Sequence, residues 1–508
     1  MEKTTRYRNI LALGAIALGL GIVHSVLFFD QAIGLNFSLF APFAVCGGLL
    51  LAHAFGRNIK REQIVLILLA FFFSSMVYVR SGELLTFYNV LGTALLLFLA
   101  ANSIAGKSVL TYFPSDYLKI IFLPIRFIKP YFKTLLEIFS LHGVMRTHPL
   151  AKEIIRGTFM AIIALTLFAW LFSSADAVFA KLIADIFSFK FDEEFAGRLF
   201  VGAIVASFFI GAFGFMYNTL HPSPAPRPEE GPRTLGAVET MILLGSLNAL
   251  FLFFILLQLS NLFGGESHVL ATGLTYAEYA RKGFFELVFV AIFAFLIISF
   301  AELQIVKSAE SHLRSFKLLS TALVLQVICV LVSAFARLSL YEDAYGFTDT
   351  RLYSHALMIW IAVVLVLLSR HIWTNGARTV FALRIFSSAV LFLFIMNILN
   401  PDVFIVKKNL ERYAESGRLD AQYLARLSDD ALPYTIQLLN DPREDIRGEF
   451  ARWLYWKNFY NYEAGIMPDT PQHPWQSSRL GSARADKLLT ENKALLEQYQ
   501  VPPLGISQ

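Results

Sequence analysis

Long apolar stretches separated by short polar segments fill the chain from residue 9 to residue 400. Each is about 20 residues long, the length that an α-helix needs to cross a bilayer core. Only helices or closed barrels satisfy their backbone hydrogen bonds in lipid. The pattern therefore predicts an all-α, polytopic transmembrane bundle of about eleven spans, near residues 9–29, 33–55, 63–80, 84–105, 157–177, 198–219, 237–262, 284–303, 316–336, 352–369 and 378–399.

The polar segments divide the chain into parts. We expect a four-span segment at 1–105, a basic interfacial segment at 106–156, spans five and six within 157–220, a Pro-rich linker at 221–236, five spans within 237–400 and a small helical tail at 401–508. The linker sequence His-Pro-Ser-Pro-Ala-Pro-Arg-Pro is too rigid and polar to form a core. We find no internal repeat between the halves, so the pattern gives no direct support to an inverted-repeat transporter.

Composition agrees with a membrane location. The chain is 56% hydrophobic and only 16% charged, and it contains 49 phenylalanines, more bulk than a soluble core of this length buries. A net charge of +5 could suggest nucleic acid as a partner, but Lys and Arg lie in short segments between spans rather than in one basic domain. We therefore expect no nucleic-acid partner.

The positions of Lys and Arg also predict the orientation. If the N-terminus lies in the cytoplasm, the basic residues gather in the inner loops, and the outer loops carry few. An odd number of spans then places the C-terminal tail outside the cytoplasm. The first apolar run has no small-residue cleavage site before Asp30, so we expect it to remain as an anchor.

The inner segment 109–153 mixes aromatic or aliphatic residues with Lys119, Arg126, Lys129 and Lys133. This mixture suits helices that lie in the interface against anionic lipids. A positive-inside signal with simple hydrophobic packing is the alternative interpretation.

The strongest candidate site surrounds the outer end of the eighth span. In a helix, Glu278, Lys282 and Glu286 fall at i, i+4 and i+8 and form a charge ladder, and Arg281 is a further candidate ligand-binding residue in the same stretch. Charge inside a bilayer is costly and tends to mark function. Alternatively, Glu286 and Lys282 form a structural clasp near the interface.

A second polar cluster lies at the outer end of the ninth span. It contains Arg337, Tyr341, Tyr345 and Arg351. Both clusters are predicted on the same side, where Arg and Tyr could hold an anionic head group. Aromatic and basic residues are also expected at any membrane interface, so the pattern leaves both interpretations open.

At the inner end, Glu239, Glu302 and Arg384 lie near span termini, and we expect an intramembrane charge pair between Arg384 and one of the acids. His355 is isolated in its span, which is more typical of a packing residue than of a ligand. Cys46 and Cys329 fall inside spans, and no nucleotide loop, Rossmann glycine pattern or zinc helix is present. The sequence thus indicates no metal and no cofactor.

Four stretches resemble a bacterial family of multi-pass membrane proteins with domain of unknown function 4173. They lie at 276–287, 340–352 and 419–433, and in a closing motif at 475–485 in which Gly481 departs from the family pattern. The resemblance covers mainly residues 150–495 and implies a bacterial membrane location. It supplies no activity.

The convergence of charged and aromatic residues favours a protein of the bacterial inner membrane that binds, or transports, a small anionic or amphipathic ligand at its outer face. The first rival is a non-catalytic scaffold or sensory partner, whose tail recruits an envelope protein through aromatic residues such as Trp453 or Trp475. A lipid-linked transferase is the last alternative, because such enzymes commonly display an acid or His in a substantial outer loop. We assign no catalytic residue, and an enzyme is the less favoured interpretation.

Overall fold

The computed structural model describes residues 2–106, 108–139, 176, 193–218, 236–262, 284–305, 310–460 and 474–500. All regular elements in these ranges are helices, which confirms the predicted all-α class. Ten described helices are long and apolar enough to cross a membrane. They correspond to ten of the eleven predicted spans, and the span predicted at 157–177 lies outside the described residues. The protein is therefore a multi-pass helical membrane protein.

The ten long helices are α1 (Glu2–Phe28), α2 (Leu35–Ala54), α3 (Arg61–Val79), α4 (Glu83–Ile104), α10 (Glu193–Asn218), α11 (Ala237–Leu262), α14 (Phe284–Gln304), α15 (Glu310–Tyr345), α16 (Asp349–Thr374) and α17 (Arg378–Leu399). Shorter helices follow α4, namely η1 (Val109–Thr111), α5 (Pro114–Ile121), α6 (Leu123–Arg126) and α7 (Ile128–Phe139). The tail contains α18 (Pro401–Ser416), α19 (Ala421–Arg426), α20 (Leu432–Thr435), η2 (Ile436–Asn440), α21 (Glu444–Tyr455), η3 (Trp456–Tyr460), η4 (Trp475–Ser477), α23 (Leu480–Glu491), α24 (Lys493–Leu496) and η5 (Glu497–Tyr499).

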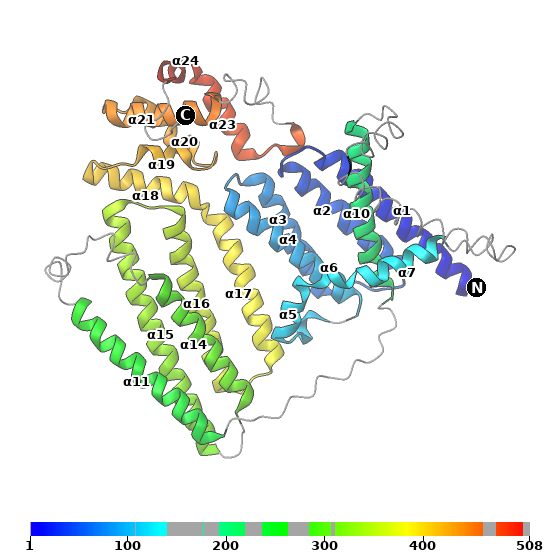
Figure 1. Cartoon of the computed structure of the whole chain (residues 1–508), viewed down its shortest axis with the longest axis horizontal. Helices are drawn as coiled ribbons and strands as arrows, with labels where there is room; N and C mark the ends of the chain where they lie inside the picture. The colour runs from blue at the N-terminus through cyan, green and yellow to red at the C-terminus, as the bar shows by residue number, and fades with distance from the viewer. Residues whose placement is uncertain are drawn as a thin grey trace.

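The spans form two bundles with separate apolar cores. The first core joins α1–α4, α10 and the short helices η1 and α5–α7, and the second joins α11 and α14–α16 (Figure 1). Helix α17 lies between them. Its side chains Phe381 and Ile385 belong to the second core, whereas Leu393 and Phe394 pack on the first. Thus α17 connects the two bundles through contacts at both of its ends.

A pair of buried asparagines joins α17 to α4. The amide of Asn89 donates to Asn397 Oδ1 at 2.8 Å, and the amide of Asn397 donates to Asn89 Oδ1 at 2.7 Å. Both side chains are fully buried. Polar side chains that bond across helices hold membrane bundles together, so this pair fixes the position of α17 against the first bundle.

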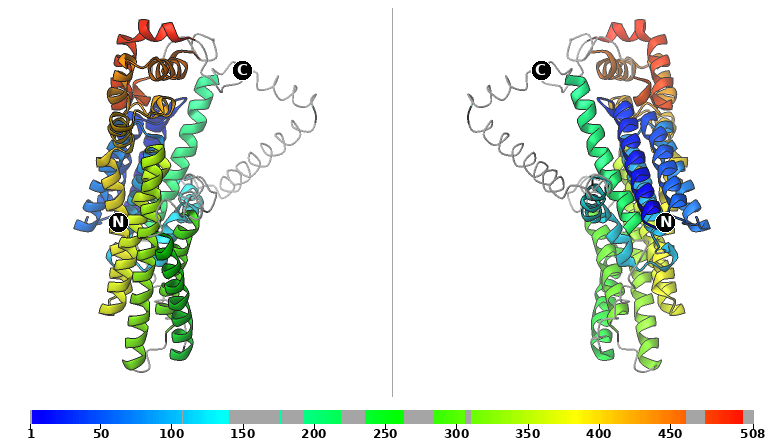
Figure 2. Two further views of the ribbon diagram at one scale, coloured as in Figure 1. Left: turned by 90° about the vertical axis from the view of Figure 1, so that its left-hand side faces the viewer. Right: turned by 90° about the vertical axis from the view of Figure 1, so that its right-hand side faces the viewer.

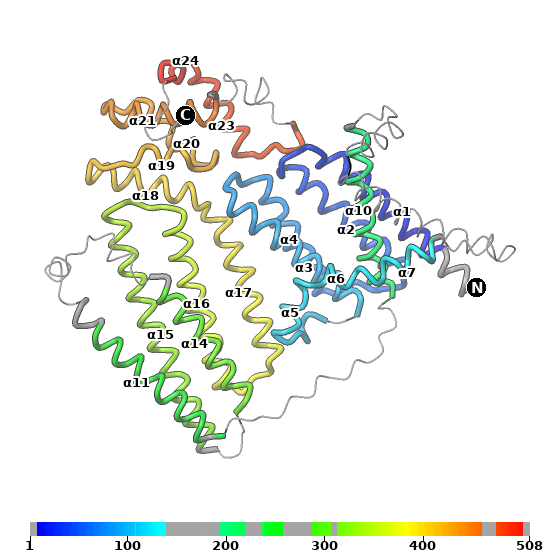
Figure 3. Tube along the Cα trace, in the orientation of Figure 1, coloured from blue at the N-terminus to red at the C-terminus, as the bar shows by residue number. Residues whose placement is uncertain are grey.

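The tail has its own small core and lies across one end of the spans (Figure 2). The chain turns sharply into it, because Asn400 adopts a left-handed conformation with φ of 50° and Pro401 begins α18. Helix α18 is bound to the α15–α16 turn, where Asn409 exchanges two 2.9 Å hydrogen bonds with the backbone of Phe347. Further along, η4 and α23 return to the ends of α2 and α3 (Figure 3). We call this end of the bundle the tail-facing end.

Candidate functional site

A pocket of about 600 Å³ lies between the tail and the tail-facing ends of the spans. Its size is typical of small-molecule sites in proteins. The bundle contributes residues 32–33, 81–85 and the start of α16, Asn400 and the start of α18 contribute 400–402, and the rest comes from the tail. We call it the junction pocket. Its charged lining residues are Glu83, Asp349, Asp402, Asp429, Asp430, Arg426, Lys457 and Arg479.

Three helices begin at the junction pocket, and each has an acidic residue in its first turn. These residues are Glu83 of α4, Asp349 of α16 and Asp402 of α18. The first N–H groups of a helix have no partner within it and carry a partial positive charge. The three carboxylates therefore offset three helix N-termini that converge on one site.

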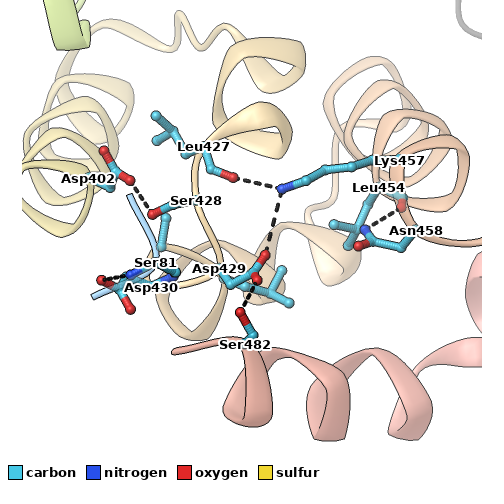
Figure 4. A network of polar contacts seen from close by, with 12 residues as sticks. Ser81, Asp402, Leu427, Ser428, Asp429, Asp430, Leu454, Lys457, Asn458 and Ser482 are labelled. Atoms are coloured by element: carbon cyan, nitrogen blue, oxygen red, sulfur yellow. Dashed lines mark hydrogen bonds and ion pairs between the residues drawn. The ribbon is translucent and has the colours of Figure 1, made fainter. Parts of the chain in front are cut away.

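Asp430 attaches the tail to the turn between α3 and α4. Its carboxylate accepts from the Ser81 backbone N–H at 3.2 Å and from the Asn400 amide at 3.3 Å. In return, the Asp430 backbone N–H donates to Ser81 Oγ at 2.8 Å (Figure 4). The tail and the α3–α4 turn thus satisfy each other's polar groups.

A second set of bonds links α16, α18 and the tail. The Ser428 hydroxyl donates to Asp402, and the Asp349 backbone N–H donates to the Tyr423 hydroxyl at 2.8 Å. Asp349 and Asp402 also line the pocket, so two carboxyl groups lie where α16 and α18 begin.

Asp429 joins three parts of the tail around the pocket. It accepts from the Ser482 hydroxyl at 2.7 Å, and its Oδ1 lies 3.8 Å from Lys457 Nζ. The same ammonium group donates to the Leu427 carbonyl at 2.8 Å (Figure 4). The segment 427–430 is thereby fixed from both sides.

Arg479 reaches from the tail to two loops of the bundle. Its guanidinium donates to the Ile33 carbonyl at 3.1 and 2.8 Å and to the Ser81 carbonyl at 3.1 Å. Beside it, the Leu35 N–H donates to the Ser478 carbonyl at 3.0 Å. Leu35 is the first residue of α2, so its N–H has no partner within the helix. The tail supplies that missing partner.

Two glycines permit this close approach. A Cβ at Gly34 would lie 2.4 Å from the Ser477 carbonyl oxygen, and a Cβ at Gly481 would lie 2.1 Å from Asp430 Oδ1. Real Cβ atoms essentially never approach other atoms so closely. Gly481 therefore has a steric role, because the glycine allows α23 to pack on Asp430.

Burial changes the acidity of several groups at the junction. It raises the pKa of Asp430 above its ordinary value, although the hydrogen bonds from Ser81 and the charge of Arg80 act in the opposite direction. Burial and the charge of Asp349 raise the pKa of Tyr423. Burial lowers the pKa of Arg479. The polar groups of the junction are thus withdrawn from water, and their hydrogen bonds to one another offset that cost.

The structure brings together part of the second predicted cluster. The Tyr341 and Tyr345 rings lie 5.0 Å apart, and the Arg351 guanidinium carbon is 4.0 Å from the centre of the Tyr341 ring. Arg337 is half-buried on α15. Of the first cluster, Glu286 is exposed in the first turn of α14. Glu278, Arg281 and Lys282 lie outside the described residues, so the meeting of the two clusters stays a prediction.

At the opposite end of the bundle, the observed ion pair joins Glu302 to Arg378, at 3.6 Å. Arg384, the cation expected from the sequence, is half-buried on α17. Glu239 accepts a hydrogen bond from the Gly236 backbone N–H at 2.8 Å and so caps α11. A charge pair that includes Arg384 stays a prediction.

The sequence interpretation missed the junction pocket as a site. Its acidic residues come from segments far apart in the chain, and single-sequence patterns do not reveal which segments meet. One signal was present, however. The stretches at 340–352, 419–433 and 475–485 each contribute lining residues, among them Asp349, Asp430 and Arg479. Three of the four stretches that carry the family resemblance therefore meet at one pocket.

Among the described residues, no group of three or more His, Cys, Asp or Glu side chains is arranged to hold a metal ion. No curated protein and no solved structure matches the chain. A family model does match, over residues 64–438, and its description is domain of unknown function (DUF4153). The family number therefore differs from the 4173 expected from the sequence. Since the match covers most of the chain, this protein belongs to the family defined by domain of unknown function DUF4153.

Proposed function

We propose that this protein binds a small amphipathic molecule in the junction pocket, and that the tail acts as the cap of the site. The observation that carries the proposal is the pocket of about 600 Å³, enclosed between two separately folded parts of the chain. Binding sites occur preferentially at such interfaces between domains. Transport of the bound molecule across the bundle would extend the same role.

The lining favours a particular ligand chemistry. Its charged side chains are five acids and three bases, so acceptors exceed cationic donors. A ligand rich in hydroxyl or ammonium groups complements that excess better than the purely anionic ligand suggested by the sequence. Leu84, Leu85 and Pro401 line the bundle side and suit an apolar portion of the ligand. The proposal therefore keeps the amphipathic character and replaces the anionic head group.

Glu83→Gln tests this ligand chemistry. Glu83 is exposed and lines the pocket, so the substitution removes one carboxylate without touching the bonds of Asp430 or Arg479. A hydrogen bond to a charged group contributes about 1.5–3 kcal/mol, so we expect retention of the bound molecule to weaken by roughly tenfold or more. Native mass spectrometry of the full chain in mild detergent measures that retention.

The matched control is Glu415→Gln, which removes an exposed carboxylate from α18 away from the pocket and should retain the molecule like wild type. Unselective lipid adducts, equal in wild type and both variants, would refute the pocket as a ligand site.

The scaffold alternative rests on the outer surface of the tail. Trp453 is buried, with 7% of its surface exposed, and packs in the core of the tail, whereas Trp475 is 55% exposed. Only Trp475 of the two therefore offers a surface to an envelope protein. A protein partner that copurifies with the full chain would appear in the same mass spectra and would favour this role.

We further propose a bacterial inner-membrane location with the N-terminus in the cytoplasm and the tail outside. The turns at 30–34, 80–82 and 346–348 lie at the tail-facing end, and together they contain one basic residue, Arg80. Arg57, Lys60 and Arg61 lie in the turn between α2 and α3 at the opposite end. This distribution supports the orientation through the preference of Lys and Arg for cytoplasmic loops.

The helices α5–α7 support the proposal that the protein binds anionic lipids at that opposite end. Large apolar side chains are exposed along them, namely Leu118, Ile121, Phe122, Ile125, Ile128, Phe132 and Leu136. Lys119, Arg126, Lys129 and Lys133 are exposed on the same helices. Exposed apolar surface next to cations is the pattern of helices that lie in the headgroup region of anionic bilayers.

The double substitution of Lys119→Gln and Lys129→Gln tests this lipid contact. Each cation near an anionic surface contributes about 1 kcal/mol, so we expect anionic lipid carried through purification to fall by roughly tenfold or more. Quantitative lipid analysis of protein extracted from mixed anionic and zwitterionic vesicles gives the measurement. The tail substitutions Lys408→Gln and Lys487→Gln provide a charge-matched control. Equal lipid content in the two double variants would exclude a specific role for α5–α7.

A further inference from the structure

A buried acid and a histidine face each other between α15 and α16. Glu342 Oε2 lies 3.2 Å from His355 Nδ1, and the two residues are 3% and 8% exposed. The Phe335 ring packs against the imidazole, with 4.0 Å between ring centres. His355 is therefore not isolated, as it looked in the sequence. Ionisable side chains inside spans are costly and commonly functional.

The hydrogen bonds around the imidazole define where its protons lie. Nε2 is 3.2 Å from the Phe335 carbonyl oxygen, which can only accept. Nε2 is also 3.4 Å from Ser339 Oγ, whose hydroxyl already donates to the same carbonyl at 3.1 Å. A hydrogen on Nε2 satisfies this carbonyl, and we assign that tautomer from the surrounding network.

The opposite nitrogen then requires a second proton. An unprotonated Nδ1 and an ionised carboxylate would place two lone pairs against each other at 3.2 Å. One proton between them removes that repulsion, either on the imidazole as an ion pair or on the carboxyl group as a neutral pair. If the proton leaves, the buried Glu342 charge faces a neutral imidazole, which is strongly unfavourable.

The other carboxylate oxygen is also informative. Glu342 Oε1 is buried and has no hydrogen-bond partner in the described part of the chain. Other titratable or charged side chains toward this end of the packed helices include Arg337, Tyr341, Asp343 and Tyr345 on α15, Asp349, Arg351 and Tyr353 on α16, Glu286 on α14 and Arg412 on α18. Within the described part of the chain, the ion-pair contact of this carboxylate is the one to His355.

From this geometry we propose that Glu342 and His355 form a binding site for one exchangeable proton inside the membrane-spanning bundle. The site lies directly below the turn that α18 contacts, where Arg412 donates to the backbone carbonyls of Asp343 at 2.8 Å and Ala344 at 2.6 Å. Loss of the proton weakens the contact between α15 and α16 at the place where the tail rests on them. The inference is independent of any ligand in the junction pocket.

The test uses Glu342→Gln in the full chain. The glutamine amide can donate permanently to Nδ1 and so imitates the protonated state without titrating. When the pH is lowered from alkaline to acidic, we expect each wild-type chain to bind one proton more than each chain of this variant. Imidazole ¹⁵N spectra should show that the His355 signal titrates in wild type and remains neutral in the variant, with the signal identified by its absence in His355→Gln.

Asp343→Asn is the matched control, because it neutralises the neighbouring exposed acid and should leave the His355 signal unchanged. If Glu342→Gln does not fold, infrared difference spectra of wild type and His355→Gln follow the Glu342 carboxyl group instead, and its pH-driven change should be altered in the variant. A His355 signal that titrates identically in wild type and Glu342→Gln, or a carboxyl change unaffected by His355→Gln, overturns the proposal.

Discussion

Gly34→Ala should detach the tail from the ends of α2 and α3. Gly34 has φ of −167°, outside the left-handed region. The alanine Cβ, however, would lie 2.4 Å from the Ser477 carbonyl oxygen and 2.7 Å from the carbonyl carbon. Because backbone atoms cannot rotate away as a flexible side chain can, the tail segment itself must move. Overpacking of this kind costs about 1–3 kcal/mol.

Limited proteolysis of the full chain in detergent measures the effect. We expect the segment around 474–482 to be cleaved much faster in Gly34→Ala than in wild type, because its contacts to Ile33, Leu35 and Ser81 are lost together. Gly19→Ala is the matched control, since a Cβ there meets no atom within 4 Å. Unchanged cleavage in Gly34→Ala would mean that the tail does not rest on this loop.

Asn89→Leu should destabilise the whole membrane bundle. The substitution leaves the Asn397 carbonyl oxygen without the 2.8 Å bond from Asn89, and it leaves one amide hydrogen of Asn397 without its 2.7 Å acceptor. Interhelical hydrogen bonds in membranes contribute about 1–2 kcal/mol in model peptides, and an unsatisfied buried partner adds its desolvation cost. We expect a loss of roughly 2 kcal/mol in the free energy of unfolding, a large fraction of a typical total.

Unfolding in a mixed detergent titration gives this free energy. The double variant of Asn89→Leu and Asn397→Leu should lose less free energy of unfolding than the two single variants lose together, because no amide is then left unpaired. Ser75→Ala controls for polarity, since that hydroxyl bonds only to the Phe71 carbonyl of its own helix. Purely additive effects would show that the two asparagines do not act as a pair.

The spans could be predicted from sequence because each depends only on local apolar length. Ten of them are present at the expected positions, and the sharp turn at Asn400 and Pro401 was visible as the start of the tail. These features depend on composition within one segment, which a single sequence records directly.

The junction pocket and the Glu342–His355 pair could not be predicted in this way. Asp349 and Asp430 are far apart in the chain and meet only because α18 folds across the ends of α15 and α16. His355 looks isolated in its span, since its partner Glu342 lies on the preceding helix and across a turn. In the sequence, Glu342 is surrounded by polar residues that are typical of a loop. Long-range pairing of this kind comes from tertiary packing, for which a single sequence without relatives has no signal.

The most direct measurement of tail closure is hydrogen exchange at the Leu35 amide in the full-length protein. This N–H begins α2 and has no acceptor within the helix, and the structure gives it the Ser478 carbonyl of the tail at 3.0 Å. We expect strong protection in wild type that is lost in Gly34→Ala, while amides in the middle of α2 stay protected in both. Exchange at Leu35 as fast as at an open helix end in wild type would contradict the closed junction, and with it the pocket that the tail completes.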